Sequence, residues 1–331
     1  MEELLIIGGI LLYLFTVLDI IQTTLSMQGG GWITSRFAHI FWKTLLKVSG
    51  GNGRAKILSH GGYFLLIYIV LIWVFLLWLS FVLLLSSDVG SVLNSSTKAP
   101  ADIWEKIYYA GFTLSTLGVG DFIGSTNFWR ILTTIYSFTG LILLTMSVTY
   151  FIPALTAVIE QRKMGIRLRN LGDSPQDILL NCWNGKNFDE FVERVNDLSE
   201  SLVQHSQNHR AYPVIHYFHN WKQKNALILQ LAKLYEAMYL LQHEVKEELR
   251  PLERELKPLE VAFENYFEVI TEVTHIKPMD EAPRLAYTTE LERHGLLAES
   301  SKKLKVPEYL IENRRIIHTL VIQDGWSWDL V

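Results

Sequence analysis

Residues 113 to 121 have residue types and a spacing that suit the binding of dehydrated cations. They read Thr-Leu-Ser-Thr-Leu-Gly-Val-Gly-Asp. Gly118 and Gly120 alternate with larger residues, so the backbone can adopt left-handed dihedral angles at every second position. Such alternation can turn successive carbonyl oxygens to one side. Four copies around an axis would then form oxygen rings that replace the water shell of a cation.

This segment lies between long apolar runs. A helix needs about 20 apolar residues to cross a bilayer, and residues 4–21, 63–85 and 131–159 are the runs that qualify. Irregular backbone at membrane depth is tolerated only where protein or a water-filled cavity surrounds it, and an ion pore supplies both conditions. The sequence therefore predicts an all-α membrane protein with three transmembrane helices, followed by an all-helical soluble domain.

The composition excludes several other classes. The 331 residues have a formal net charge of −4 and a single cysteine, Cys182. This charge argues against a nucleic-acid partner, and one cysteine permits neither an intrachain disulfide nor a CxxC metal site. The N-terminus lacks the basic region of a secretory signal, so the first apolar run is expected to be retained. No catalytic constellation can be justified, and we expect no enzyme activity.

The charges of the loops predict the topology. Between the first two apolar runs lie five basic residues and no acidic residue, which places this loop in the cytoplasm. The segment 86–102 has Lys98 as its only basic residue and is expected outside. The basic cluster 162–169 follows the third run and returns the chain to the cytoplasm. We therefore expect a multi-pass protein of the plasma (inner) membrane with its N-terminus outside and its C-terminal half inside.

Residues 101–114 are too short and too mixed in polarity to span a membrane. Asp102 suits the first turn of a helix, and Trp104, Ile107, Tyr108 and Phe112 recur at helical spacing. The pattern predicts a short helix that dips into the membrane from outside. The negative end of its dipole would favour a cation, and residues 116–120 would carry the chain back as an extended filter loop.

The segment Thr116-Leu117-Gly118-Val119-Gly120-Asp121 matches the pattern T-x-G-x-G-D of the tetrameric potassium-channel pore family. Residues 61–160 resemble this family. Arg130 and Gly140, nine and nineteen residues after Asp121, agree with simple bacterial members. The resemblance implies a homotetramer, because one re-entrant loop per chain supplies one quarter of a pore. It also implies a potassium-preferring cation channel that has no cofactor beyond potassium ions in its filter and has membrane lipid around it.

The resemblance also implies roles for individual residues. Backbone carbonyls would line the ion sites, the Thr116 hydroxyl would complete the innermost one, and Asp121 would brace the filter or attract cations at its mouth. The ion-binding segment would comprise Thr116, Leu117, Gly118, Val119 and Gly120, with Asp121, Phe112 and Tyr108 as filter supports. The alternative for Gly118 and Gly120, a plain turn, would not need Thr and Asp at its two ends.

Val119 stands where the family usually has an aromatic residue, and Phe112 stands where a smaller or acidic residue is common. Since valine cannot hydrogen-bond, packing would hold the filter. A poorly selective cation channel is therefore the alternative in the same class. A membrane-anchored sensor or scaffold with a vestigial pore is the alternative in another class.

The third apolar run contains two candidate pivots for a gate. Gly140 resembles a hinge glycine, and Pro153 removes one helical hydrogen bond and bends a helix. Both residue types also occur in membrane helices without a gating role. With either residue as the pivot, we expect the cytoplasmic helical domain to open and close the channel.

The predicted domains are an extra N-terminal transmembrane helix with an interfacial helix (1–60), a pore domain (61–163) and a cytoplasmic helical domain with a regulatory or assembly role (164–331). Asp19 is an intramembrane acid, which makes it a functional candidate or a local cap. The amphipathic segment 32–47 is expected to lie at the cytoplasmic interface or against the C-terminal half. No multi-arginine voltage sensor is present.

The C-terminal half predicts helices at 188–205, 211–223, 225–249, 252–274 and 307–323, without a nucleotide-binding pattern of strands and glycine-rich loops. Its histidines admit a metal site, although we favour solvated or capping roles. They are His205, His209, His216 and His219. A gating ligand or protein partner for this domain is expected but not identified.

Overall fold

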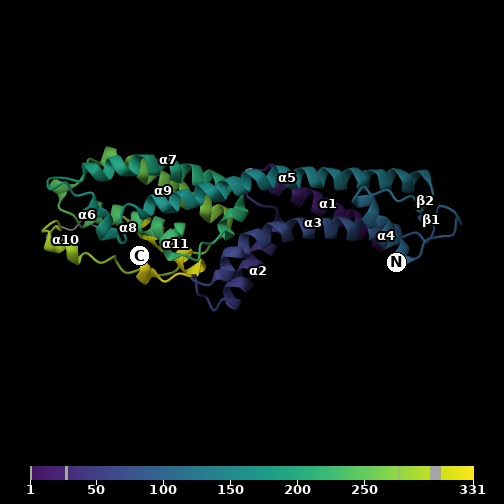
Figure 1. Ribbon diagram of the computed structural model, residues 1–331, viewed down its shortest axis with the longest axis horizontal. Helices are drawn as coiled ribbons and strands as arrows, with labels where there is room; N and C mark the ends of the chain where they lie inside the picture. The colour runs from purple at the N-terminus through teal and green to yellow at the C-terminus, as the bar shows by residue number, and fades with distance from the viewer. Residues whose placement is uncertain (1, 27–28, 275, 299–306) are drawn as a thin grey trace. The chain divides into compact units, whose positions relative to one another are not determined.

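The computed structural model describes residues 2–26, 29–274, 276–298 and 307–331 (Figure 1). The chain divides into two compact units. The first comprises residues 1–26, 30–39 and 64–153, and the second comprises residues 27–29, 40–63 and 154–331. Each unit is described by itself below.

Three long helices dominate the membrane part of the chain. They are α1 (Glu2–Leu25), α3 (Gly61–Ser86, after the short 3-10 helix Lys56–His60) and α5 (Asn127–Arg169). Each is long and apolar enough to cross a membrane, as the sequence predicts. α3 is apolar on all sides, which is typical of a helix enclosed by lipid and protein. α5 continues without interruption through Pro153.

Within the first unit, hydroxyl groups join these helices. The Tyr136 hydroxyl of α5 lies 2.9 Å from Ser80 Oγ of α3, and the Tyr13 hydroxyl of α1 lies 2.8 Å from Thr139 Oγ1 of α5. The rings of Phe81 and Tyr136 stack with centroids 4.1 Å apart. Small hydroxyl side chains permit close helix packing in membranes, which accounts for the polar residues along α5.

The re-entrant helix α4 (Ile103–Leu114) begins at a capping box. The Asp102 carboxylate accepts from the Glu105 amide at 2.9 Å, and the Glu105 carboxylate accepts from the Asp102 amide at 2.8 Å. Such a box stabilises a helix start by about 1 kcal/mol. The expected short helix at 101–114 is therefore present.

Two short antiparallel strands lie before α4 and after the loop that follows it in the chain. β1 (Val92–Asn94) pairs with β2 (Phe122–Gly124) in the register Val92↔Gly124, Leu93↔Ile123 and Asn94↔Phe122. These strands were not predicted from the sequence, because three residues are too few to show a period of two. Their pairing brings the two ends of the re-entrant segment together.

The second unit is a helical domain around one apolar core. Its helices are α6 (Pro175–Asn181), α7 (Asp189–Ala211), α8 (Leu227–His243), α9 (Glu253–Thr274), α10 (Thr289–Arg293) and α11 (Glu308–Gln323). Short 3-10 helices lie at Pro213–Tyr217, Gln223–Asn225, Glu247–Leu249 and Trp328–Leu330. α7 and α9 lie side by side (Figure 1).

α8 forms the centre of this core and is buried along most of its length. Its Glu236 carboxylate is fully buried and accepts two hydrogen bonds from the Arg314 guanidinium of α11, at 2.6 and 3.0 Å. Two parallel bonds of this kind fix geometry as well as charge. The pair therefore sets the register between α8 and α11.

One predicted helix of this domain is wrong. Residues 211–223 do not form an α-helix; the chain leaves α7 at Tyr212 and continues as the 3-10 helix Pro213–Tyr217 and a loop. Pro213 explains the break, because a proline disfavours the helical conformation at the residue before it. Tyr212 has φ −132° and ψ 74°, outside the helical region.

The segment predicted at 32–47 is the helix α2 (Trp32–Val48). Its buried residues Thr34, Ala38 and Trp42 are four residues apart and so lie on one face. Within the second unit, Trp42 Nε1 donates to the Gln323 carbonyl at 3.1 Å, and the Trp42 ring contacts Tyr217 with centroids 5.9 Å apart. The C-terminal part of α2 therefore packs on the C-terminal half, as one of the two alternatives proposed.

Candidate ion filter

The backbone of residues 116–120 alternates in handedness. Thr116, Gly118 and Gly120 have positive φ angles of 60°, 59° and 86°. The left-handed positions expected at the two glycines are present. Thr116 adds a third, which is uncommon for a β-branched residue and carries local strain. Left-handed residues thus occupy every second position from 116 to 120, the alternation for which the sequence predicts carbonyls on one side.

The last turn of α4 fixes the N-terminal end of this segment. Ser115 N donates to the Gly111 carbonyl, Thr116 N to the Thr113 carbonyl and Leu117 N to the Phe112 carbonyl, at 3.0, 3.0 and 2.9 Å. These bonds use carbonyls that a helix end otherwise leaves unpaired. The entry into the filter is thus rigidly continuous with α4.

The C-terminal end of the segment 116–120 is anchored at Asp121. Its carbonyl accepts from Ser95 N at 2.8 Å, next to the β1–β2 pair. Its side chain interacts with the Tyr108 side chain, and its Oδ1 is buried without a hydrogen-bond partner among the described residues. The residue predicted to brace the filter therefore lies beside the tyrosine predicted to support it.

Aromatic rings form a wall beside the filter. Phe112 is buried and packs edge to face against Tyr108 and Tyr109, with centroids 5.2 and 5.1 Å apart. The Tyr109 hydroxyl lies 2.7 Å from Thr133 Oγ1 of α5. In contrast, Leu117 and Val119 are 69% and 50% exposed in the single chain. The side chains of Leu117 and Val119 are therefore not covered by the chain itself.

A polar group that holds α4 against α3 was not predicted from the sequence. Lys106 is buried, and its Nζ donates to the carbonyls of Leu85 and Asp88 at 3.0 and 2.7 Å. The Asp88 carboxylate accepts from Trp129 Nε1 of α5 at 2.9 Å. The available signal was the single lysine of the segment 101–114, which apolar and aromatic residues follow. Arg130 Nε donates to the Gly124 carbonyl at 3.0 Å and fixes the strand β2.

Gly140 lies where α5 passes the end of α4. A Cβ atom at this position would lie 1.8 Å from the Leu114 carbonyl oxygen. Close packing therefore already requires glycine at position 140, whether or not the residue also serves as a hinge. Pro153 lies inside α5, and nothing in its surroundings assigns it a further role.

Asp19 joins three helices of the first unit. Its carboxylate accepts hydrogen bonds from Ile33 N and Thr34 N at the start of α2, from Thr34 Oγ1 and from Trp73 Nε1 of α3, at 2.8, 3.3, 2.6 and 2.9 Å. A Cβ on Gly31 would lie 2.1 Å from Asp19 Oδ1. A carboxylate at a helix N-terminus is favoured by the helix dipole, so these contacts are those of a cap.

We expect the Asp19→Ala variant to lose about 3 kcal/mol of stability, because it leaves several buried donors without partners. The Asp102→Ala variant is the matched control, since Asp102 caps α4 at an exposed position, and should lose only about 1 kcal/mol. Thermal melting of both variants in detergent measures the difference. Equal losses of stability in the two variants would show that the buried contacts of Asp19 stabilise the fold no more than the exposed cap at Asp102 does.

The histidines of the second unit separate into two groups. His205, His209 and His216 lie together, with ring centroids 4.5 Å apart for the first two and 5.9 Å for the last two. His219 instead contacts Asp324 Oδ1 through Nδ1 at 2.9 Å and the Gly53 carbonyl through Nε2 at 2.6 Å. Within the described part of the chain, no group of three or more His, Cys, Asp or Glu side chains is placed to hold a metal ion.

Burial lowers the pKa of His205 to about 3 and holds the pKa of His209 well below its usual value, with nearby histidines lowering both further. Burial also lowers the pKa of His219, but Asp324 and the Gly53 carbonyl outweigh it and raise this pKa overall. His205 and His209 are therefore neutral in the fold near neutral pH, whereas His219 is protonated more readily than in the unfolded chain.

These shifts predict a loss of stability in mild acid. The unfolded chain protonates His205 and His209 near pH 6.5 and the fold does not, so each costs about 1 kcal/mol per pH unit below that value. His219 has the opposite sign, but its stabilising contribution grows only as the pH falls from its raised folded-state pKa to about 6.5 and stays constant below that value. Melting temperatures between about pH 7.5 and 5.5 should fall for the wild type and less for His205→Gln. An unchanged pH dependence in that variant would contradict the prediction.

Two similarities connect the chain to known proteins. Residues 63–157 match a family model described as an ion channel. The chain is also 32% identical over 326 residues to the uncharacterized membrane protein YdjJ of Bacillus subtilis (strain 168), covering 98% of this chain and 95% of that protein. No solved structure matches. The match of 63–157 contains α4 and the filter segment and most of α3 and α5.

Proposed function

The chain belongs to the ion channel pore family, and from this premise we propose that it is a potassium-preferring cation channel. Four copies would assemble around an axis on which the carbonyls of residues 116–119 form the filter. The ions would move passively, and the chain would perform no catalysis. The helical domain of the second unit would control the gate.

One observation carries the proposal: the alternation of positive φ angles at Thr116, Gly118 and Gly120. A turn that only connected two helices would not require left-handed backbone at three alternate positions. Such backbone at Thr116, the one position of the three that is not glycine, costs about 1–2 kcal/mol. Rings of carbonyl oxygens that replace a hydration shell do require such a pattern. A single filter segment per chain supports a cyclic tetramer.

The exposure of the filter supports an assembly as well. Residues 115–120 are all exposed in one chain. Irregular backbone does not face lipid. Neighbouring subunits would therefore cover this segment.

We propose the orientation that the loop charges favour. The filter mouth and the N-terminus would face outward, and the second unit would lie in the cytoplasm of a cell whose inner membrane holds the channel. The basic residues before α3 and after α5 support this orientation.

The test is potassium flux into liposomes that contain the purified protein, followed by bi-ionic recordings with potassium and sodium. The proposal expects flux, with a reversal potential that favours potassium. Flux without discrimination would support the poorly selective channel that Val119 suggests, because valine offers no hydrogen bond to brace the filter. The absence of flux, with the protein folded and tetrameric, would instead support a scaffold with a vestigial pore.

A further inference from the structure

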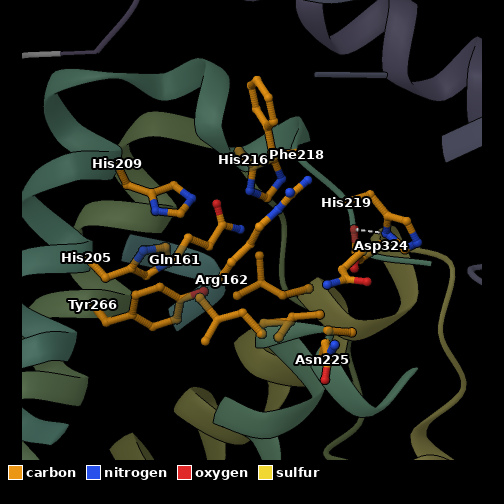
Figure 2. A pocket seen from close by; sticks show the side chains of 15 residues that line it. Gln161, Arg162, His205, His209, His216, Phe218, His219, Asn225, Tyr266 and Asp324 are labelled. Atoms are coloured by element: carbon orange, nitrogen blue, oxygen red, sulfur yellow. Dashed lines mark hydrogen bonds and ion pairs between the residues drawn. The ribbon is translucent and has the colours of Figure 1, made fainter. Parts of the chain in front are cut away.

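The second unit contains a small half-open cavity at the C-terminal end of α5. Its volume is about 50 Å³, and residues from α5, α7, α8, α9 and α11 line it. Figure 2 shows Gln161 and Arg162 of α5 with His205 and His209 of α7 and His216 around this space. A volume of this size admits a few water molecules or one small ion.

The N-terminus of α8 opens into this cavity. Ala226 is its N-cap residue and offers no side-chain hydrogen bond, and Ala226, Leu227 and Ile228 all line the space. The first-turn amides of a helix have no partner inside the helix. Together with the helix dipole, such amides form a site for an anion. A helix end alone does not define a site, so the remaining lining matters.

Unpartnered polar atoms surround the same space. His205 and His209 are 4% and 3% exposed, and the Nδ1 atom of each has no hydrogen-bond partner among the described residues. The same is true of Gln161 Oε1 and Asn225 Oδ1. An unpaired buried polar group costs about 1–3 kcal/mol. Side-chain amides can turn over to present their NH₂ groups, so all four residues can donate to one ligand.

The charge of the cavity favours an anion. Arg162 lines it and donates from one guanidinium nitrogen to the Tyr63 hydroxyl at 2.9 Å, which leaves other N–H groups of the fork for a ligand. The one acidic residue of the lining, Asp324, is paired with His219. The lining therefore keeps the positive charge of Arg162 and the partial positive charge of the α8 N-terminus uncompensated.

We propose that this cavity binds a phosphate group, held by the first-turn amides of α8, the Arg162 guanidinium and the imidazole and amide groups of His205, His209, Gln161 and Asn225. The phosphate is either free or the end of a small phosphorylated metabolite, since the cavity is half open. Its binding would join the end of α5 to α7 and α8. The binding itself does not depend on the proposed conduction.

The test uses the purified full-length protein, with inorganic phosphate as the first probe and glycerol 3-phosphate as the second, at constant ionic strength in chloride. We expect phosphate to raise the melting temperature saturably and chloride to have no such effect. Binding of the second probe alone would assign the site to phosphorylated metabolites, and binding of both would assign it to the phosphate group itself.

Two variants test the placement. Arg162→Gln should weaken phosphate binding about tenfold or more, as loss of a charge-assisted contact does. Ala226→Asp supplies an internal carboxylate to the α8 amides and should abolish the phosphate effect. Arg169→Gln, also on α5 but outside the cavity lining, is the control and should bind like the wild type. If neither probe affects the wild type, or if Arg162→Gln binds the probes as tightly as the wild type does, the proposal is overturned.

Discussion

Replacing Gly118 by alanine should abolish potassium flux and leave the protein folded. The glycine has φ +59°, and nothing lies within 4 Å of the position that a Cβ would take. The substitution therefore meets no steric obstacle within the chain. The substitution costs about 1–2 kcal/mol for left-handed backbone in each chain, and the proposed assembly would repeat this cost in four copies. We expect the carbonyl of residue 118 to turn away from the axis and the ion site to be lost.

The matched control is Gly50→Ala. Gly50 has φ +68° and the same open surroundings, but it lies in the turn after α2. The backbone strain is similar in the two variants, and only one of them changes the filter. Flux through liposomes should disappear for Gly118→Ala and persist for Gly50→Ala. Persistence of flux in both variants would remove residues 116–120 from the conduction path.

The second large effect is expected at Gly140. A Cβ here would lie 1.8 Å from the Leu114 carbonyl oxygen and 2.8 Å from its carbon. Because both are backbone atoms at the end of α4, no side-chain rotation can relieve the contact. The end of α4 or the path of α5 must shift, at a cost of about 3 kcal/mol or more. Gly140→Ala should therefore melt earlier and also lose flux, since Leu114 lies at the end of the helix that leads into the filter.

This result separates packing from hinging at Gly140. If the residue acted only as a hinge, alanine would leave stability almost unchanged and would alter opening alone. Gly8→Ala is the control, because Gly8 lies in the membrane helix α1 with nothing within 4 Å. A Gly140→Ala protein as stable as Gly8→Ala, with altered gating, would contradict the packing account.

The local pattern around the filter could be predicted from the sequence for a physical reason. Glycines at positions 118 and 120 permit left-handed backbone wherever they occur, and long uncharged runs have few alternatives to membrane helices. The helix ahead of the filter was also predictable, because Asp102 suits a helix start and the aromatic and apolar residues after it recur at helical spacing. These signals are local, and each acts within about one helical turn or one span.

Contacts between distant residues could not be predicted. The sequence marks Asp19 as unusual but does not reveal that its partners are Thr34 and Trp73. It suggests a hinge at Gly140 and gives no sign of the Leu114 carbonyl. Likewise, the histidine spacing admitted a metal site beside the favoured solvated or capping roles, and neither interpretation reveals that His219 contacts Asp324. Such pairings depend on how the helices pack, which periodicity alone does not specify.

The same limit explains the wrong helix at 211–223. Its residues are compatible with a helix, but the loop is held by tertiary contacts such as the bond between His219 and the Gly53 carbonyl. Pro213 was the local signal against a helix that begins at residue 211.

The central claim is that residues 116–120 of four copies form a cation filter. The most direct measurement is an experimental structure of the purified assembly in potassium, with a second data set in which potassium is replaced by thallium. The account predicts a four-fold assembly with ion density on its axis, between the carbonyls of Thr116, Leu117, Gly118 and Val119. An assembly in which these segments lie apart, or a four-fold axis without ion density between them, would contradict it.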